Sequence, residues 1–179
     1  MKTRSRIFVV DADIARAAGP DPKDRPWPDT AKAAHDVLDA LWRCRGFMVV
    51  FDPILRDEWR EHAGRTADRW FARMLERRRI RRVSRATGAW LDPLIDAHLD
   101  PSEQRTARKD AHLVLLAHAP GDKRVLSNDR RAKRTFSRIP DRRVQAIHWV
   151  EASEDACRWL MDGAPDMPAW RLGHRRRSR

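Results

Sequence analysis

Short, uniformly apolar runs recur along the chain and predict buried β-strands. The clearest lie at 6–10, 47–51 and 124–127, where β-branched residues are frequent. A weaker run at 80–83 predicts a peripheral strand, and 144–150 predicts a further buried one. The chain is therefore expected to contain a sheet of four to five strands.

Between these runs, apolar residues recur at spacings of three and four, which predicts amphipathic helices. In 29–44, for example, Ala34, Val37 and Leu41 share one face. Further helices are expected at 11–18, 52–62, 66–78, 101–119, 128–136 and 153–161, and the segment 88–99 is expected to be helical or irregular. Buried strands joined by helical crossovers indicate an α/β fold with a mainly parallel sheet covered on both faces.

The length of 179 residues suits one compact domain. We place this domain at 1–162 and expect 163–179, which is rich in proline and arginine, to be a flexible basic tail. The proline-rich segment 19–28 predicts a loop. No apolar run approaches the roughly 20 residues that span a bilayer, and the one near the N-terminus is too short for a secretory signal, so no membrane partner is expected.

The charge of the chain indicates the kind of partner, and its cysteine content indicates the cellular compartment. The chain has 38 Lys and Arg against 26 Asp and Glu, a net charge of +12, and the excess is not confined to the tail. A strongly basic, arginine-rich chain suits a polyanion such as nucleic acid. Cys44 and Cys157 have no Cys or His at metal-ligand spacing, so two reduced thiols and a cytoplasmic location are expected.

Four acidic residues stand where a ligand site is expected. Asp11 directly follows the first strand and Asp129 follows the third, and the carboxyl ends of parallel strands share one edge of the sheet. Glu58 lies two turns into the helix after the second strand. Asp110 shares a helical face with Leu113 and Val114, and a carboxylate facing inward needs a partner.

Four carboxylates that converge on one crevice would repel one another unless a cation lay between them. Mg²⁺ and Mn²⁺ prefer oxygen ligands, and they activate water for phosphodiester hydrolysis. The opposing interpretation is that some of these acids only cap helices, as Asp129 would for the helix that follows it. The order of the four acids along the strand–helix plan favours the metal site.

These positions resemble the PIN-domain nucleases. The motifs are Ile7-Phe8-Val9-Val10-Asp11, Ile54-Leu55-Arg56-Asp57-Glu58, Lys109-Asp110 followed by an apolar helix, and Val125-Leu126-Ser127-Asn128-Asp129. The resemblance covers about residues 6–150. It implies a PIN-like three-layer α/β/α sandwich, Mg²⁺ or Mn²⁺, and cleavage of RNA. Because many small bacterial members are toxins, it also implies an antitoxin protein and a homodimer as partners.

The resemblance also assigns roles to residues. Asp11, Glu58, Asp110 and Asp129 would be catalytic metal ligands, Asp13 a fifth ligand through water, and Ser127 would orient Asp129 or a water. Cations at Lys109, Arg130, Arg131, Lys133 and Arg134 would hold the RNA backbone, or else would line a solvated helix face. The chain departs from the family in having Asp13 where Asn or Ser is common, Ser127 where Thr is commoner, and a length beyond that of the smallest toxins.

Other functions are less well supported. A phosphate-binding α/β domain would need a glycine-rich loop, and the seven glycines form no such motif. A catalytically silent nucleic-acid-binding protein would not need all four acids. A flap-type nuclease that acts on DNA stays open. The seven histidines show no ligand spacing, so they are expected to be core or surface residues with no general base among them.

Overall fold

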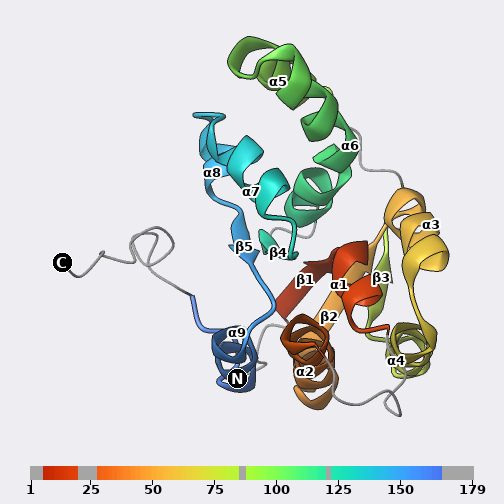
Figure 1. The fold of residues 1–179 in the computed structure, drawn as a ribbon. Helices are drawn as coiled ribbons and strands as arrows, with labels where there is room; N and C mark the ends of the chain where they lie inside the picture. Colours follow the sequence, from red (N-terminus) through yellow and green to blue (C-terminus); the bar gives the residue numbers. More distant parts are fainter. Residues whose placement is uncertain (1–5, 20–27, 85–87, 120–121, 167–179) are drawn as a thin grey trace.

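Five parallel strands form the middle layer of the protein (Figure 1). The computed structural model describes residues 6–19, 28–84, 88–119 and 122–166. The strands lie in the order β3-β2-β1-β4-β5, with bounds β1 Arg6–Val10, β2 Phe47–Phe51, β3 Ile80–Arg82, β4 Arg124–Leu126 and β5 His148–Val150. With helices on both faces, this is a three-layer α/β/α sandwich, which confirms the expected fold class.

The chain changes direction across the sheet between β1 and β4. It leaves β1 through helices to β2 and β3 on one side, then returns to β4 and β5 on the other. Val10 of β1 pairs with Leu126 of β4. Crossovers that leave two adjacent strands in opposite directions open a crevice at the carboxyl ends of those strands, and ligands bind there in α/β proteins.

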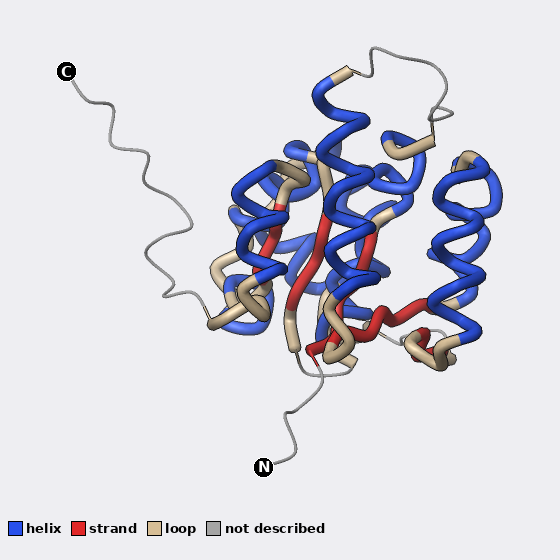
Figure 2. Tube along the Cα trace, turned by 90° about the horizontal axis from the view of Figure 1, so that it is seen from below, coloured by secondary structure: helices blue, strands red, loops and turns tan. Residues whose placement is uncertain are grey.

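The helices form two groups, and the strands lie between them (Figures 1 and 2). One group contains α1 Ala12–Ala17, α2 Asp29–Arg43, α3 Pro53–His62, α4 Arg65–Glu76 and α9 Glu154–Met161. The other contains α5 Asp92–His98, α6 Pro101–His118, α7 Arg130–Ser137 and α8 Arg142–Gln145. Helix α3 contacts α6, so the two groups also meet beside the crevice.

Side chains on both faces of the central strands are buried, as the uniformly apolar runs predicted. Phe8, Val50 and Val125 have no more than 1% of their surface exposed. The indole of Trp59 on α3 donates its Nε1 hydrogen to the carbonyl oxygen of Val10 at 2.9 Å. This bond holds α3 against the end of β1.

Two sequence expectations need revision. The run 144–150 is not one strand: Asp141 caps the short helix α8 by accepting from the Arg143 backbone nitrogen at 2.8 Å, and only His148–Val150 pairs with β4. Val144 and Ile147 are both buried, three residues apart, because the chain turns between them.

In the described part of the chain, no helix combines the length and apolar character needed to cross a membrane.

Residues 163–166, expected to belong to the flexible tail, contact the folded domain. Ala164 is fully buried, and its backbone nitrogen donates to the carbonyl oxygen of Trp159 at 2.9 Å. Asp166 pairs with Arg124 of β4 at 2.5 Å and with Arg6 of β1 at 3.0 Å. Residues 163–166 therefore belong to the folded domain, and 167–179 lie outside the described residues.

Candidate active site

Asp11 and Ser127 join the ends of β1 and β4. The backbone nitrogen of Asp11 donates to the Leu126 carbonyl oxygen at 2.9 Å, which continues the strand pairing by one residue. The Ser127 hydroxyl then donates to Oδ2 of Asp11 at 2.7 Å. Burial raises the pKa of Asp11, although the bond from Ser127 opposes that rise. A buried carboxylate thus sits at the crevice predicted from the strand order.

Asp13 lies in the first turn of α1 beside Asp11. Its Oδ2 accepts from the Asn128 backbone nitrogen at 2.8 Å, whereas its Oδ1 is buried and has no hydrogen-bond partner among the described residues. Burial, and next the charge of Asp11, raise the pKa of Asp13 to about 7. Burying a carboxylate oxygen without a partner is costly, so this oxygen is a candidate ligand atom.

Asp129 and Asp110 line the same cleft, of 660 Å³, from α7 and α6. Asp129 also caps α7, since its Oδ1 accepts from the backbone nitrogens of Arg131 and Ala132 at 2.7 and 2.9 Å. Asp129 therefore does cap a helix, which is the role that the sequence analysis set against metal binding. Burial, then the charges of Asp129 and Asp11, raise the pKa of Asp110 to about 6.

Glu58 contacts a histidine that sequence reasoning did not assign to the site. Oε2 of Glu58 lies 3.2 Å from Nε2 of His112, whose side chain is 5% exposed. Burial raises the pKa of Glu58, but the adjacent imidazole more than offsets it, and the net pKa is lowered. The charge of His112 lowers the pKa of Asp11 and that of Glu58 raises it, so the pair acts electrostatically on the end of β1. The sequence did offer a signal for His112, because it is a polar residue on the apolar face of its helix and such a residue needs a hydrogen-bond partner.

The predicted cations divide into two sets. Lys109 and Arg131 line the cleft with Asp110 and Asp129, together with Arg105, which the sequence analysis did not select. Arg130 instead makes a two-pronged ion pair with Glu151, at 2.7 and 3.0 Å. Lys133 and Arg134, which were also predicted to hold the RNA backbone, are exposed on α7 and lie outside the cleft lining.

Carboxylate oxygens suit a hard divalent cation, but in this structure their positions do not form a metal site. Within the described residues, no three His, Cys, Asp or Glu side chains stand where they could hold a metal ion together. The raised pKa values of Asp13 and Asp110 show that negative charge is buried here at a cost. An all-oxygen set with an orphaned carboxylate oxygen fits Mg²⁺ or Mn²⁺, provided the side chains move toward one another on binding.

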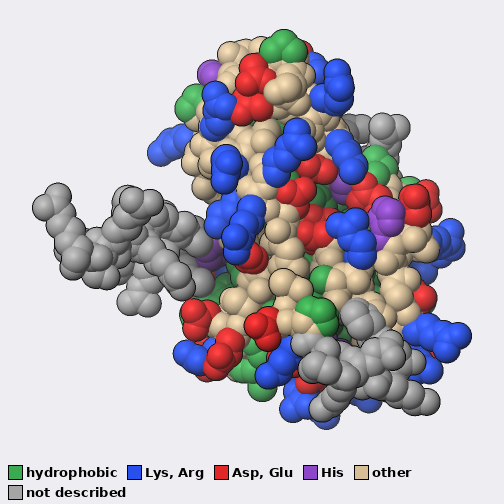
Figure 3. Space-filling view, in the orientation of Figure 1, with side chains coloured by type: hydrophobic (Ala, Val, Ile, Leu, Met, Phe, Trp, Pro, Cys, Tyr) green, Lys and Arg blue, Asp and Glu red, His purple; other side chains and the backbone are tan. Residues whose placement is uncertain are grey.

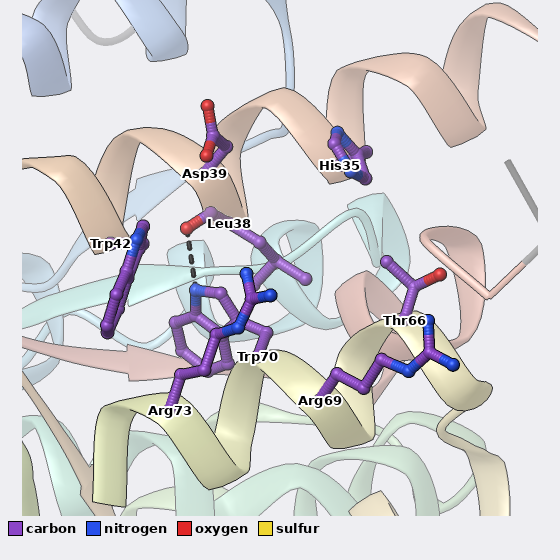
Figure 4. Close-up of a pocket in the computed structure, with 8 residues that line it drawn as sticks. All are labelled: His35, Leu38, Asp39, Trp42, Thr66, Arg69, Trp70 and Arg73. Atoms are coloured by element: carbon purple, nitrogen blue, oxygen red, sulfur yellow. Dashed lines mark hydrogen bonds between the residues drawn. The ribbon is translucent and has the colours of Figure 1, made fainter. Parts of the chain in front are cut away.

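The surface view places these acids in context. Acidic side chains gather in the middle of the face shown in Figure 3, between the α6–α7 and α1–α3 regions, with Lys and Arg on either side. A separate hollow of 220 Å³ lies between α2 and α4 over the indole of Trp70 (Figure 4), whose Nε1 donates to the Leu38 carbonyl oxygen at 2.6 Å. None of the predicted site residues lines that hollow, so it is not part of the candidate active site.

Comparisons with known proteins add no assignment. The chain matches no protein-family model, no curated protein and no solved structure. The similarity to PIN-domain nucleases therefore remains a resemblance of short motifs and their order.

Proposed function

We propose that this protein is a metal-dependent ribonuclease that hydrolyses RNA phosphodiester bonds. One observation carries the proposal: Asp110 and Asp129, from segments far apart in the sequence, line one cleft, and the two residues before Asp129 hydrogen-bond to Asp11 and Asp13 at the ends of β1 and β4. The charge of Glu58, from α3, also acts on Asp11. Acids buried together inside a strongly basic protein are hard to explain as solubility or capping alone.

Asp11, Asp13, Asp110 and Asp129 are the residues that would hold Mg²⁺ or Mn²⁺, with Glu58 as a further ligand once it leaves His112. The cation supplies Lewis-acid activation of water and neutralises charge on the phosphate. Ser127 keeps Asp11 oriented through its 2.7 Å hydrogen bond. Lys109 and Arg131, at the cleft, are placed to bind phosphate oxygens.

The finer parts of the proposal follow from the resemblance. RNA as substrate implies a cytoplasmic location, which agrees with the two free cysteines. An antitoxin protein and a second copy of the chain are the partners that a toxin role would require. Expression of the chain with and without a candidate antitoxin protein, and the mass of the purified protein in solution, test these two points.

The decisive experiment is incubation of the purified protein with a panel of RNAs and Mn²⁺, with and without chelator. We expect cleavage only with metal, and a loss of at least ~100-fold in Asp11→Asn, Asp110→Asn and Glu58→Gln with the fold retained. Asp57→Asn is the matched control for Glu58→Gln, because Asp57 is the adjacent, exposed residue on α3. Cleavage by the Asp11 or Asp110 variant at the normal rate refutes the proposal.

The same panel separates the alternative functions. Binding of RNA without any metal-dependent cut identifies a catalytically silent nucleic-acid-binding protein. When branched and single-stranded DNA are added to the panel, cutting confined to DNA identifies a flap-type nuclease. Both outcomes reject a ribonuclease.

A further inference from the structure

Three cations line the cleft between α6 and α7 without forming an ion pair to any described residue. Arg105 and Lys109 stand one helical turn apart on α6, and Arg131 faces them from the first turn of α7. Across the part of the chain that the structure describes, none of the three forms an ion pair. Two like charges at this helical spacing repel slightly, so their retention suits an anionic ligand.

Several other arginines on or beside these elements form ion pairs. Arg130 pairs with Glu151, Arg138 with Glu103, and Arg143 with Asp141. Arg108, one residue before Lys109, pairs with Asp96. On α6, Arg105 and Lys109 form no ion pair among the described residues, in contrast to Arg108, and both line the cleft in which Asp110 and Asp129 also lie. Lys133 and Arg134 of α7 also form none, but they lie outside the cleft lining.

Burial and size indicate how a ligand would lie. Arg105, Lys109 and Arg131 are exposed, whereas Asp110 and Asp129 are partly buried, so the cations form the rim and the acids lie deeper. The volume of 660 Å³ is that of a pocket for a small ligand, which suits a short stretch of one strand better than the greater width of a duplex. None of the side chains that line it is aromatic, so it offers no surface on which a base could stack.

We propose that this cleft binds the sugar-phosphate backbone of single-stranded RNA, with Arg105 and Arg131 gripping phosphates on the two sides of Asp110 and Asp129. The inference rests on the proposed function for the identity of the nucleic acid. Recognition through phosphates carries no base information, so affinity depends strongly on salt and little on base sequence. Three contacts correspond to a slope of log affinity against log salt of about −2 for a single strand.

The test measures binding of fluorescein-labelled single-stranded RNA oligomers to the full-length protein in chelator, which prevents cleavage. We expect Arg105→Gln and Arg131→Gln each to weaken binding about tenfold and to reduce the salt slope by about 0.7. Lys133→Gln and Arg134→Gln remove the same charge from exposed positions of α7 outside the cleft, so they should change affinity little. Oligo-A, oligo-U and mixed sequences should bind alike, and an RNA duplex more weakly.

Equal losses in all four variants, or a duplex bound as tightly as a single strand, would overturn the cleft assignment. The result is independent of catalysis. Selective weakening by the Arg105 and Arg131 variants in a protein that cuts no RNA leaves the cleft proposal standing while the ribonuclease proposal fails. If the protein cuts RNA in a metal-dependent way but all four variants bind RNA equally, the ribonuclease proposal stands and the cleft proposal fails.

Discussion

Single side chains in the site show how the surroundings set the charge of an acid. Asp110 and Glu58 both lie on helices at the crevice, yet their pKa values move in opposite directions. Burial and two neighbouring carboxylates raise that of Asp110 to about 6, whereas His112 outweighs burial and lowers that of Glu58. The surroundings of the two acids therefore differ: burial and negative charge dominate at Asp110, whereas His112 dominates at Glu58.

The imidazole of His112 lies between a backbone carbonyl oxygen and a carboxylate. Its Nδ1 lies 3.1 Å from the carbonyl oxygen of Lys109, which can only accept a hydrogen bond, so Nδ1 carries a hydrogen. Its Nε2 faces the Glu58 carboxylate at 3.2 Å and is best satisfied with a hydrogen as well. Burial lowers the pKa of His112, but Glu58 and Asp52 more than compensate, and the net pKa is raised. Through its contacts with Glu58 and with the Lys109 carbonyl oxygen, the buried imidazole links α3 to α6.

Replacing His112 with Asn tests this link. Asn keeps a donor near the Lys109 carbonyl but cannot reach Glu58, so the carboxylate loses its partner. We expect the free energy of unfolding to fall by about 1–3 kcal/mol, and the loss to be smaller when Glu58→Gln is also present. Urea denaturation of the two single variants and the double variant measures the coupling. Additive effects of the two substitutions would contradict a direct interaction.

At the scale of whole elements, one arginine joins the end of α2 to the start of the sheet. Arg79, directly before β3, is buried, and its guanidinium donates to four carbonyl oxygens at 2.5 to 2.7 Å: those of Leu41, Trp42, Cys44 and Phe47. The last carbonyls of a helix have no partner within the helix, and a cation at that end is favourable. Arg79 therefore fixes where α2 stops and β2 begins.

We expect Arg79→Met to destabilise the protein by about 3 kcal/mol or more, because it leaves several buried carbonyl oxygens without donors. Arg79→Lys should recover only part of the loss, since an ammonium group cannot match the planar fork of the guanidinium. Arg81→Met is the control, because Arg81 is exposed on the neighbouring strand. Chemical denaturation compares the three, and equal stability of the two Met variants would show that the carbonyl contacts contribute little.

For the molecule as a whole, protons and metal ions compete for the same acids. The pKa values of Asp13 and Asp110, about 7 and about 6, lie above the ordinary value of 3.8, so the folded protein holds protons that the unfolded chain releases. Their stabilising contribution is complete below about pH 4 and is lost as the pH rises through 6 and 7. A metal ion has the opposite preference, because it binds the deprotonated carboxylates.

Thermal unfolding with Mn²⁺ or with chelator at pH 5 and pH 8 tests this competition. At pH 8, Mn²⁺ at about 100 times its Kd should raise Tm by roughly 5–10 °C, and at pH 5 by much less. Asp110→Asn should reduce the rise, whereas Asp68→Asn, an exposed residue of α4, should not. A rise of equal size at both pH values, or an unchanged rise in the Asp110 variant, argues against metal binding by these acids.

The sequence by itself determined most of the elements and the edge of the sheet at which Asp11 and Asp129 stand. This was possible because apolar periodicity is local and parallel strands must end at a common edge. It failed at 142–147, where Val144 and Ile147 are buried from a turn of helix and not from a strand. An apolar run of that length does not distinguish the two conformations.

Tertiary structure alone decided which distant groups meet. The hydrogen bond from Ser127 to Asp11 spans 116 positions, and it depends on β4 lying beside β1 and not beside β3. The contact of Glu58 with His112 depends on α3 reaching α6, and the choice of Arg105 over Arg130 at the cleft depends on where Glu151 lies. Such contacts follow from the packing of whole elements, which residue spacing along the chain does not encode.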